Sequence, residues 1–421
     1  MTRRNMAKIA EIKNCRLCGA KKLRVVLPLH PTPVGDLYLP KNKQPEKLEC
    51  FPLDVYQCAN CGHVQLKAIV DPEYLYTDYI YTTSSSIGLA EHFQSYATRT
   101  VRKLDMKPGS LVVEIGSNDG TMLRGFQREG MKVIGVDPAT EIAAKATQSG
   151  VPTIHGFFSI ETAKNIVKMH GKADLFVANN VLANVPCPRE IFLGVLELLK
   201  TDGVIIFETG YLKYLAEDCV FDNIYHEHID YYSIQPLISF FKSLDLELFD
   251  VDVSDSKGSS IRCYVQRIGG KHSIGGRIKG LCHREHEIGY GSAEPYKRLS
   301  DHLEETKQQV HKILRPLKDQ GKVVAGFGAS VGVTTMLYHF ELEGIVDYLL
   351  DDNPVRQGRF SPGMALEVKS PKILATENRP DIVLILAWRY AGPIIQKHGS
   401  LYQAQGGQFL QLLPTVEYLK I

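Results

Sequence analysis

The stretch SLVVEIGSNDGTMLRGFQREGMKVIGVDPA, residues 110–139, decides the fold. An apolar run ends at Glu114, a turn with two glycines follows, and a second apolar run, KVIGV, ends at Asp137. We expect a helix between the two runs, so the pattern predicts a βαβ unit of a parallel sheet. Ligands of such sheets bind beyond the carboxyl ends of the strands, where the glycine turn and Asp137 both lie.

The spacing of the turn indicates which ligand it binds. Gly116 and Gly120 are four residues apart, which differs from the G-x-G-x-x-G dinucleotide pattern, and no Walker lysine follows. Glu-x-Gly-x-x-x-Gly with an acid closing the second strand is the pattern of S-adenosylmethionine (SAM) methyltransferases. The glycines let a ligand approach the backbone, and Asp137 can accept hydrogen bonds from both ribose hydroxyls. A generic glycine turn, with Asp137 as a helix cap, is the plainer alternative.

Further elements extend this sheet on both sides. AEHFQSYATRTVRKL (residues 90–104) predicts a helix before the first strand. ADLFVANN (173–180) predicts a strand ending at a pair of asparagines, and GVIIFETG (203–210) predicts another ending at Glu208. The predicted cofactor-binding residues are therefore Glu114, Gly116, Asn118, Asp119, Gly120, Asp137, Asn179 and Asn180.

Length and composition exclude several classes of protein. A chain of 421 residues with 44% hydrophobic positions has room for two to four domains. Its formal charge of +2 is too small to predict a nucleic-acid partner, which usually shows as a strong basic excess. The sequence has no apolar signal core and no window near the roughly 18 consecutive apolar residues of a membrane span. We therefore expect a cytoplasmic protein that binds neither nucleic acid nor membranes.

Four of the nine cysteines lie in two Cys-x-x-Cys-Gly turns, CRLCGA (15–20) and CANCGH (58–63). The two-residue gap lets both thiolates of a turn reach one ion, and the glycine permits a left-handed backbone. Together the turns predict a structural Zn²⁺ site without an open position, and we expect a small sheet between them. Core thiols or a redox pair are the alternatives, and Cys50 and His63 are interpreted as core or surface residues. The predicted metal ligands are Cys15, Cys18, Cys58 and Cys61.

The stretch YHEHIDYYS (225–233) places a phenol, two imidazoles and a carboxylate at four consecutive positions. It follows GVIIFETG by about fifteen residues, so we expect it to fold over the carboxyl ends of the same strands. Removing a proton from a carbon next to a ketone requires a base near that carbon and donors for the enolate oxygen. These four side chains can supply such groups, although a lone histidine near a strand end is more often structural.

A third segment repeats the pattern of strand and turn. Residues 295–321 predict a packed connecting helix with an apolar stripe. KVVAGFGASVGVTTML (322–337) then predicts a strand, a Gly-x-Gly turn and a helix, and two later strands are expected to end at Asp352 and Trp388. The segment predicts a second, smaller nucleotide-type α/β domain. The helix N-terminus after its glycine turn either holds a diphosphate or merely packs.

The order of these motifs resembles a known family along nearly the whole chain. In sequence they are the two cysteine turns, VVEIGSNDG, NNVLANVP, YHEH, DDNPVRQGRFSPG and LILAWRYA. The chain resembles the three-domain, zinc-binding nucleotide-sugar C-methyltransferases, typified by the deoxysugar 3-C-methyltransferases. The resemblance implies methyl transfer from SAM to carbon next to the 4-keto group of a dTDP- or GDP-linked deoxysugar. We expect a monomer.

The resemblance also implies roles for single residues. His228 matches the base that removes the α-proton, and Tyr225 and Glu227 match hydrogen-bonding or orienting groups. Tyr79 matches another active-site tyrosine, and Tyr81 replaces it if the register differs. The C-terminal domain helps to hold the nucleotide sugar. The predicted substrate-binding residues are Tyr81, Asn184, Arg262, Gly328, Ser330, Asp352 and Asn353.

Two stretches depart from the family's pattern. Asn184 stands where the family usually has histidine after Asn-Asn-Val-Leu-Ala, and asparagine can donate a hydrogen bond but cannot shuttle a proton. Lys257 to Arg262 replaces the family's Gly-Gly-Ser-Leu-Arg with Lys-Gly-Ser-Ser-Ile-Arg. Both changes bear on the sugar and on which carbon is methylated.

The predicted fold class is α/β in three parts. Residues 1–75 form a zinc-binding module, residues 76–295 a central doubly wound SAM-dependent methyltransferase domain with a Rossmann-like sheet, and residues 296–421 a smaller Rossmann-like α/β domain. Three alternative functions remain open. They are a sugar O-methyltransferase of the same fold, an enzyme with a catalytic metal on His226 and His228, and a zinc module that docks RNA or protein beside a degenerate methyltransferase fold.

Overall fold

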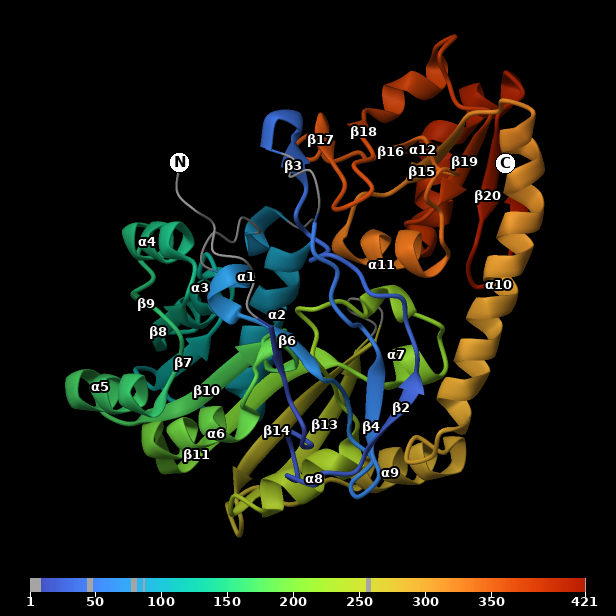
Figure 1. Ribbon diagram of the computed structural model, residues 1–421. Coiled ribbons are helices and arrows are strands. Elements are labelled where there is room, and N and C mark those ends of the chain that lie inside the picture. The colour runs from blue at the N-terminus through green and yellow to red at the C-terminus, as the bar shows by residue number, and fades with distance from the viewer. Residues whose placement is uncertain (1–8, 44–47, 77–81, 86–87, 255–258, 421) are drawn as a thin grey trace.

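The computed structural model describes residues 9–43, 48–76, 82–85, 88–254 and 259–420. Its centre is a seven-stranded sheet in the order β13-β14-β11-β10-β7-β8-β9 (Figure 1). Strands β9, β8, β7, β10 and β11 are parallel, and β14 and β13 are antiparallel to their neighbours. The strands are β7 (Leu111–Ile115), β8 (Lys132–Asp137), β9 (Thr153–His155), β10 (Ala173–Asn179), β11 (Leu199–Gly210), β13 (Leu246–Ser254) and β14 (Ser260–Arg267).

Helices cover both faces of this sheet because successive strand residues point to opposite faces. Val112 of β7 packs with apolar residues of α2 and α3, whereas Val113 belongs to the cluster that includes apolar residues of α5, α6 and α8. Strand β7 is therefore buried throughout, as expected for an inner parallel strand. These helices are α2 (Leu89–Lys103), α3 (Thr121–Arg128), α5 (Ile160–His170), α6 (Pro188–Leu198) and α8 (Ile234–Lys242), with α4 (Thr140–Gln148) between β8 and β9.

The N-terminal module forms a four-stranded sheet in the order β12-β5-β4-β2. Its outer strand β12 comes from the central segment, directly after the YHEH stretch, and pairs antiparallel with β5. The module therefore shares a sheet with the loop that carries the predicted base. Its elements are β1 (Ile9–Glu11), β2 (Leu23–Leu27), β3 (Leu39–Pro40), β4 (Val55–Cys58), β5 (Val64–Leu66), β6 (Ala68–Val70), α1 (Pro72–Tyr76) and the borrowed β12 (Asp230–Tyr231).

The C-terminal part is a six-stranded sheet in the order β18-β16-β15-β19-β20-β21. The chain reaches it through α9 (Gly276–Ile288) and the long helix α10 (Glu294–Asp319), which runs along the outside of the molecule (Figure 1). Leu299, Leu303, Val310 and Leu314 of α10 are buried, so the predicted apolar stripe is confirmed. Other elements are β15 (Val324–Phe327), α11 (Val331–His339), β16 (Tyr348–Leu350), β17 (Arg359–Phe360), β18 (Val368–Lys369), β19 (Ile382–Ile385), α12 (Ala391–Ala404), β20 (Gln408–Gln411) and β21 (Glu417–Leu419).

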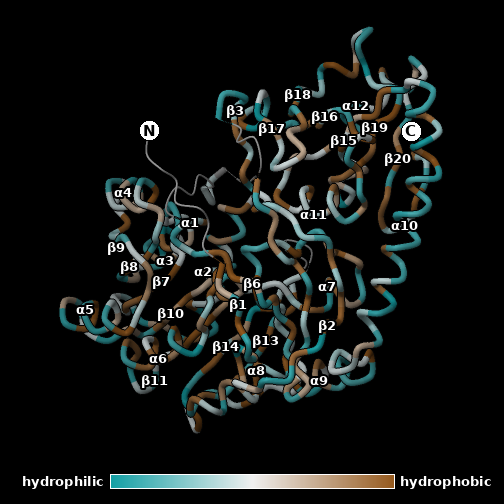
Figure 2. The backbone as a smooth tube through the Cα atoms, viewed as in Figure 1, coloured by the Kyte–Doolittle hydropathy of each residue, from teal (hydrophilic) through white to brown (hydrophobic). Residues whose placement is uncertain are grey.

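The hydropathy of the chain follows these layers. Figure 2 shows hydrophobic colour concentrated in the strands of the two large sheets and hydrophilic colour along the outer side of α10. The predicted α/β fold with a zinc module and two Rossmann-like sheets is confirmed. Within the described ranges, no helix combines the length and the apolar character that crossing a bilayer requires.

Candidate active site

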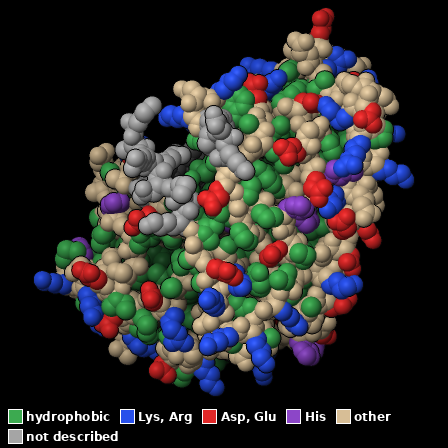
Figure 3. Space-filling model, viewed as in Figure 1, with side chains coloured by type: hydrophobic (Ala, Val, Ile, Leu, Met, Phe, Trp, Pro, Cys, Tyr) green, Lys and Arg blue, Asp and Glu red, His purple; other side chains and the backbone are tan. Residues whose placement is uncertain are grey.

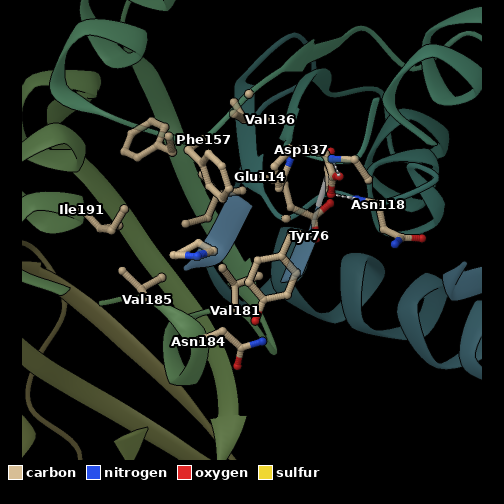
Figure 4. Close-up of a pocket in the computed structure, with 18 of the residues that line it drawn as sticks. Tyr76, Glu114, Asn118, Val136, Asp137, Phe157, Val181, Asn184, Val185 and Ile191 are labelled. Atoms are coloured by element: carbon tan, nitrogen blue, oxygen red, sulfur yellow. Dashed lines mark hydrogen bonds between the residues drawn. The ribbon is translucent and has the colours of Figure 1, made fainter. Parts of the chain in front are cut away.

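A cavity of about 1030 Å³ opens at the carboxyl edge of the central sheet. Glu114, Asn118 and Asp137 lie on one side of it, and Asn184 and Ile191 lie on the other (Figure 4). Small-molecule sites usually measure roughly 300–1,000 Å³, so this cavity is at the upper end of the range. The space admits a cofactor together with part of a second molecule.

The glycine turn at the floor of the cavity is tightly packed. Gly116 has a φ of +59°, and a Cβ built there would lie 2.3 Å from Cγ2 of Val181. Gly120 has a φ of +76° and a similar close approach to Val151. Glycine at 116 is therefore required both by the left-handed backbone and by a neighbouring side chain, which is a packing reason that the sequence pattern did not reveal.

Asp137 closes β8 and organises the turn. One carboxylate oxygen accepts from the backbone N–H of Asn118 at 2.8 Å, and the other accepts from Ala139 at 2.9 Å. Burial raises the pKa of Asp137, while these two backbone donors oppose the shift. Each oxygen keeps a second lone pair, so the carboxylate can still accept hydrogen bonds from a ligand in the cavity.

Several buried polar atoms around the cavity lack a partner within the described part of the chain. They are Glu114 Oε2, Ser117 Oγ, both amide atoms of Asn179, and Asn184 Oδ1. Buried polar groups in native proteins are nearly always hydrogen-bonded, so a polar ligand is expected to satisfy them. Burial also raises the pKa of Glu114 well above its usual range. This donor and acceptor set fits the amino, carboxylate and ribose groups of SAM.

The eight predicted cofactor-binding residues fall into two groups, those that line the cavity and those that form the turn beneath it. Six members line the cavity, namely Glu114, Gly116, Asn118, Asp137, Asn179 and Asn180. Asp119 and Gly120 instead build the turn beneath it. Asp119 accepts from the backbone N–H of Thr121 at 3.1 Å and of Ser84 at 2.9 Å, and from the Thr121 hydroxyl at 2.6 Å. Burial raises the pKa of Asp119, but the side-chain and backbone hydrogen bonds from Ser84 and Thr121 outweigh it and lower the pKa. The roles of all eight residues in binding remain predictions.

Two parts of the cavity had almost no signal in the sequence pattern, namely the segment that covers it and its apolar wall. Thr83 donates its backbone N–H to Oδ1 of Asn118 at 2.8 Å, which ties the segment after the zinc module to the glycine turn. Tyr76 also lines the cavity, and Phe157 and Leu193 border it with 45% and 39% of their surface exposed. Figure 3 shows hydrophobic side chains around a hollow on this face. Only the stretch containing Tyr79 signalled that this segment matters, and Tyr79 and Tyr81 themselves lie outside the described residues.

The YHEH stretch forms a hydrogen-bonded array beside this cavity. His228 Nδ1 lies 3.0 Å from the carbonyl oxygen of Asn223, and Nε2 lies 2.9 Å from the hydroxyl of Tyr225. Because a carbonyl only accepts, Nδ1 carries the proton of the neutral ring, and Nε2 accepts from Tyr225. The two rings are 4.1 Å apart between centroids. The structure thus brings together two of the predicted catalytic side chains and leaves the basic lone pair on Nε2.

The other two members of the stretch have different surroundings. Loss of hydration raises the pKa of Glu227 to about 8, the Asp36 carboxylate adds to the shift, and Arg356 opposes it. His226 is 2% exposed and bonds through Nε2 to the carbonyl of Phe51 at 3.3 Å, and burial lowers its pKa to about 4. The alternating histidines therefore point to separate partners. Among the described residues, the only group with metal-ligating atoms close enough together is the four cysteines.

Backbone contacts place this loop next to the cavity rather than in its described lining. The N–H of Ile229 donates to the carbonyl of Ala183 at 2.7 Å, in the short 3-10 turn η3 (Leu182–Asn184) that follows β10. Asn184 of that turn lines the cavity, whereas His228 and Tyr225 are not among its lining residues. The short turn η3 therefore lies between the residues that line the cavity and the pair formed by His228 and Tyr225.

Arg262, predicted to bind substrate, lies in a buried polar cluster. Its guanidinium donates to Glu208 at 2.6 and 3.0 Å and stacks 3.3 Å from the ring centre of Tyr96. Glu208 lies on β11 opposite Asn179 of β10, and Arg262 sits opposite Glu208 on β14. Strand β11 continues to Gly210, two residues beyond its expected end. The cluster supports the carboxyl edge of the sheet, and a role of Arg262 in binding substrate remains a prediction.

The C-terminal glycine turn is packed against other parts of the chain. Ser330 accepts a hydrogen bond from Tyr38 at 3.4 Å, and a Cβ on Gly328 would meet Ala387 at 3.0 Å. Asp352 forms ion pairs with Lys397 at 2.9 Å and His398 at 3.1 Å. Asn353, in the same loop, accepts from the backbone N–H of Val355 at 3.0 Å. These contacts shape the loops after β15 and β16, and the predicted contact with a nucleotide sugar is an expectation that they leave open.

The four cysteines come together as the sequence predicts. Sγ of Cys15 lies 3.6 Å from that of Cys61, Sγ of Cys18 lies 3.6 Å from that of Cys58, and all four lie within 4.8 Å of one another. Gly19 and Gly62 have φ values of +73° and +80°, as the two knuckle turns require. Four thiolates at this separation fit a tetrahedral Zn²⁺ with no open coordination position. We call the two Cys-x-x-Cys-Gly turns the zinc knuckles.

Comparisons with known proteins give the class of the whole chain. Residues 15–76 match a zinc binding domain, residues 89–251 a methyltransferase domain, and residues 255–414 a C-methyltransferase C-terminal domain. The chain is 31% identical over 407 residues to the C-methyltransferase NovU of Streptomyces niveus, covering 96% of both chains. The ubiquinone biosynthesis O-methyltransferase of Actinobacillus pleuropneumoniae serotype 7 is 32% identical over 111 residues, covering 24% of this chain and 46% of the relative.

A solved methyltransferase structure matches part of the chain. Magnesium protoporphyrin IX methyltransferase from Synechocystis PCC 6803 aligns over 43% of this chain and 84% of its own, with 14% identity and a TM-score of 0.34. The matches along the sequence define a SAM-dependent methyltransferase with a zinc-binding module. The chain belongs to the three-domain C-methyltransferase family that includes NovU. It is therefore a SAM-dependent enzyme that methylates carbon. This contradicts the alternative hypothesis of a docking module beside a degenerate methyltransferase fold.

Proposed function

We propose that the enzyme methylates the carbon next to the 4-keto group of a nucleotide-linked deoxysugar, with C-3 as the methylated carbon. The observation that carries this proposal is the Asn223, His228 and Tyr225 array, which presents a neutral imidazole with its basic lone pair on Nε2. Removal of an α-proton requires such a base. SAM, bound among Glu114, Asn118 and Asp137, supplies an electrophilic methyl group.

In this proposal His228 is the final proton acceptor. The carbonyl of Asn223 keeps the Nδ1 proton in place at 3.0 Å, and it stabilises the imidazolium that forms when Nε2 takes a proton. The Tyr225 hydroxyl occupies Nε2 at 2.9 Å in the structure, so it either moves aside or passes the proton on. Along either route a proton ends on Nε2, and the electron pair of the C–H bond becomes that of an enolate. With SAM bound, the enolate carbon would form a bond to the methyl group as the S–CH₃ bond breaks, and S-adenosylhomocysteine would leave.

We propose that two other side chains support the developing negative charge. Asn184 lines the cavity, and its side-chain amide can donate to an enolate oxygen where the family usually has a histidine. Glu227, with a pKa of about 8, is largely protonated at neutral pH and can donate as well as accept. We also propose that the loops at Gly328, Ser330, Asp352 and Asn353 hold the nucleotide, that Tyr79 and Tyr81 complete the sugar site, and that the three domains meet near residues 75 and 295.

The test measures proton removal separately from methyl transfer. Nucleotide-linked 4-keto sugars are screened with labelled SAM, and the product is located by mass spectrometry. The accepted sugar is then incubated in deuterated water with S-adenosylhomocysteine in place of SAM. His228→Ala should reduce exchange of the α-hydrogen by about 10²- to 10⁴-fold, the usual contribution of a positioned base, while binding of both ligands persists.

Two variants sharpen the result. Tyr225→Phe should abolish exchange if the hydroxyl relays the proton, and should preserve it if the hydroxyl only moves aside. His226→Ala is the matched control, because this imidazole contacts Phe51 and not the array. Normal exchange by His228→Ala would place the base elsewhere. Methylation of a hydroxyl without any exchange would make the enzyme an O-methyltransferase.

A further inference from the structure

A fully buried ion pair joins the zinc knuckles to the strand that follows the predicted base. Nη1 of Arg16 lies 3.1 Å from Oδ1 of Asp230, and Nε2 of His63 lies 2.7 Å from the same oxygen. The side chains of Arg16, His63 and Asp230 are 2%, 0% and 0% exposed. Arg16 immediately follows the first knuckle cysteine, and His63 follows the glycine of the second knuckle. The residues next to the two knuckles therefore bind the same carboxylate, that of Asp230.

Arg16 also holds the backbone around Asp230. Its Nη1 donates to the carbonyl of Ile229 at 2.8 Å, and its Nη2 donates to the carbonyl of Leu66 on the neighbouring strand at 2.8 Å. The opposite side of Ile229, its N–H, donates to the carbonyl of Ala183 beside the cavity. One guanidinium thus fixes the residue between His228 and Asp230 from one side, and the turn after β10 fixes it from the other.

The path from this ion pair to the imidazole is short. Asp230 lies two residues beyond His228, and the Tyr231 hydroxyl donates to the carbonyl of His228 at 2.9 Å. A displacement of Asp230 would therefore move the backbone of His228 and alter its distance from a substrate. A misplacement of about 1 Å can reduce turnover roughly a hundredfold.

A buried ion pair is a poor way to gain stability. Replacing such a pair by apolar residues is often neutral or stabilising, because desolvation of the charges offsets their attraction. The best-supported role of such a pair is to fix one arrangement of the groups around it. Here the groups so fixed are the two zinc knuckles and the strand after His228.

We propose that Arg16 and His63 are positioning residues that act through Asp230, so that zinc binding in the knuckles and placement of the His228 imidazole are coupled. Zinc fixes the backbone of both knuckles and with it the donors that hold Asp230 and Ile229. This inference rests on the proposed function, because it takes His228 as the proton acceptor.

The test compares Arg16→Gln, Asp230→Asn and the double variant in the full chain. Arg24→Gln is the matched control, because Arg24 belongs to the same module but bonds to Gln57 and to the carbonyl of Gly291. Each variant is measured for zinc content, thermal stability, SAM affinity, kcat, and amide hydrogen exchange of residues 225–232. A parallel sample of the wild-type chain is treated with a zinc chelator and followed by the same amide exchange.

We expect both single variants to keep zinc and SAM affinity, to lose roughly ten- to a hundredfold in kcat, and to exchange faster over residues 225–232. The double variant removes both charges, so its stability should recover while its kcat stays low. Arg16→Lys should restore part of the turnover, because it keeps the charge but not the fork of donors. Chelation should likewise speed amide exchange over these residues, and Arg24→Gln should behave as wild type.

Two results would overturn the coupling: turnover that recovers together with stability in the double variant, or amide exchange over residues 225–232 that neither the variants nor chelation changes. Failure of the proposed function looks different. If His228 is not the proton acceptor, the variants still loosen residues 225–232, but His228→Ala leaves substrate α-hydrogen exchange at the normal rate.

Discussion

Asp137→Asn tests the cofactor site with the smallest change of shape. The carboxylate accepts one backbone N–H on each oxygen, from Asn118 and from Ala139. An amide replaces one of these oxygens by an NH₂ group, so one backbone donor then faces another donor. The remaining oxygen also loses its charge, which weakens every hydrogen bond it accepts.

The size of the effect follows from these contacts. A hydrogen bond to a charged group contributes about 1.5 to 3 kcal/mol, and each 1.4 kcal/mol changes an equilibrium constant tenfold. Losing the charge-assisted bond to a ribose hydroxyl should therefore raise the Kd for SAM by about ten- to a hundredfold. Misplacement of the glycine turn, whose Asn118 N–H loses its acceptor, should act in the same direction.

Isothermal titration calorimetry with SAM measures this change directly. Asp174→Asn is the control, because Asp174 accepts the backbone N–H of Leu111 at 2.8 Å in the same sheet but does not line the cavity. The control should lose stability without losing affinity. An unchanged Kd in Asp137→Asn would remove Asp137 from the SAM site and with it the ribose assignment.

Three further predictions follow from the described contacts. Cys15→Ser combined with Cys58→Ser should lower zinc content and thermal stability together, and stoichiometric zinc in metal analysis would refute the four-cysteine site. The pKa of Glu227 is raised from 4.5 to about 8, so its ionisable side chain contributes stability that is complete below pH 4.5 and is lost as pH rises through 8. The unfolding free energy of the wild type relative to Glu227→Gln should fall across that interval in denaturant titrations, and a constant difference would contradict the shift. Gly116→Ala should weaken SAM binding and stability, because its Cβ would meet Val181 at 2.3 Å at a φ of +59°, and an unaltered variant would disprove the tight turn.

Local patterns predicted the βαβ unit well because strand and helix periodicity is written in neighbouring residues. Strand β8 ends at Asp137 and β10 ends at Asn179, as expected. The expected ends of β16 and β19 lay further along the chain than the observed ends at Leu350 and Ile385. Apolar residues continue past Ile385 after β19, whereas two aspartates follow Leu350 after β16, so the residue types alone do not locate the last paired residue of either strand.

Contacts between residues far apart in the sequence could not be predicted from local patterns. Arg16 and Asp230 are separated by 214 positions, and no sequence motif around either residue indicates that they form an ion pair. His63 was interpreted as a core or surface residue, and only its place opposite Asp230 reveals its bond to β12, the strand that follows the YHEH stretch. The wall formed by Phe157 and Ile191 likewise depends on how distant loops meet at the edge of the sheet.

The predicted division into three domains stays a prediction, but the YHEH loop has contacts to all three parts of the chain. The YHEH loop is held by Arg16 of the zinc module, by Ala183 beside the SAM cavity, and by the C-terminal part. From that last part, Thr335 donates to the carbonyl of Ile224 at 2.7 Å, and Trp388 donates to Asp222 at 3.2 Å. The position of His228, the proposed base, therefore depends on the joint arrangement of these three parts. For this reason we expect methyl transfer to require the zinc module, whose Arg16 holds the loop.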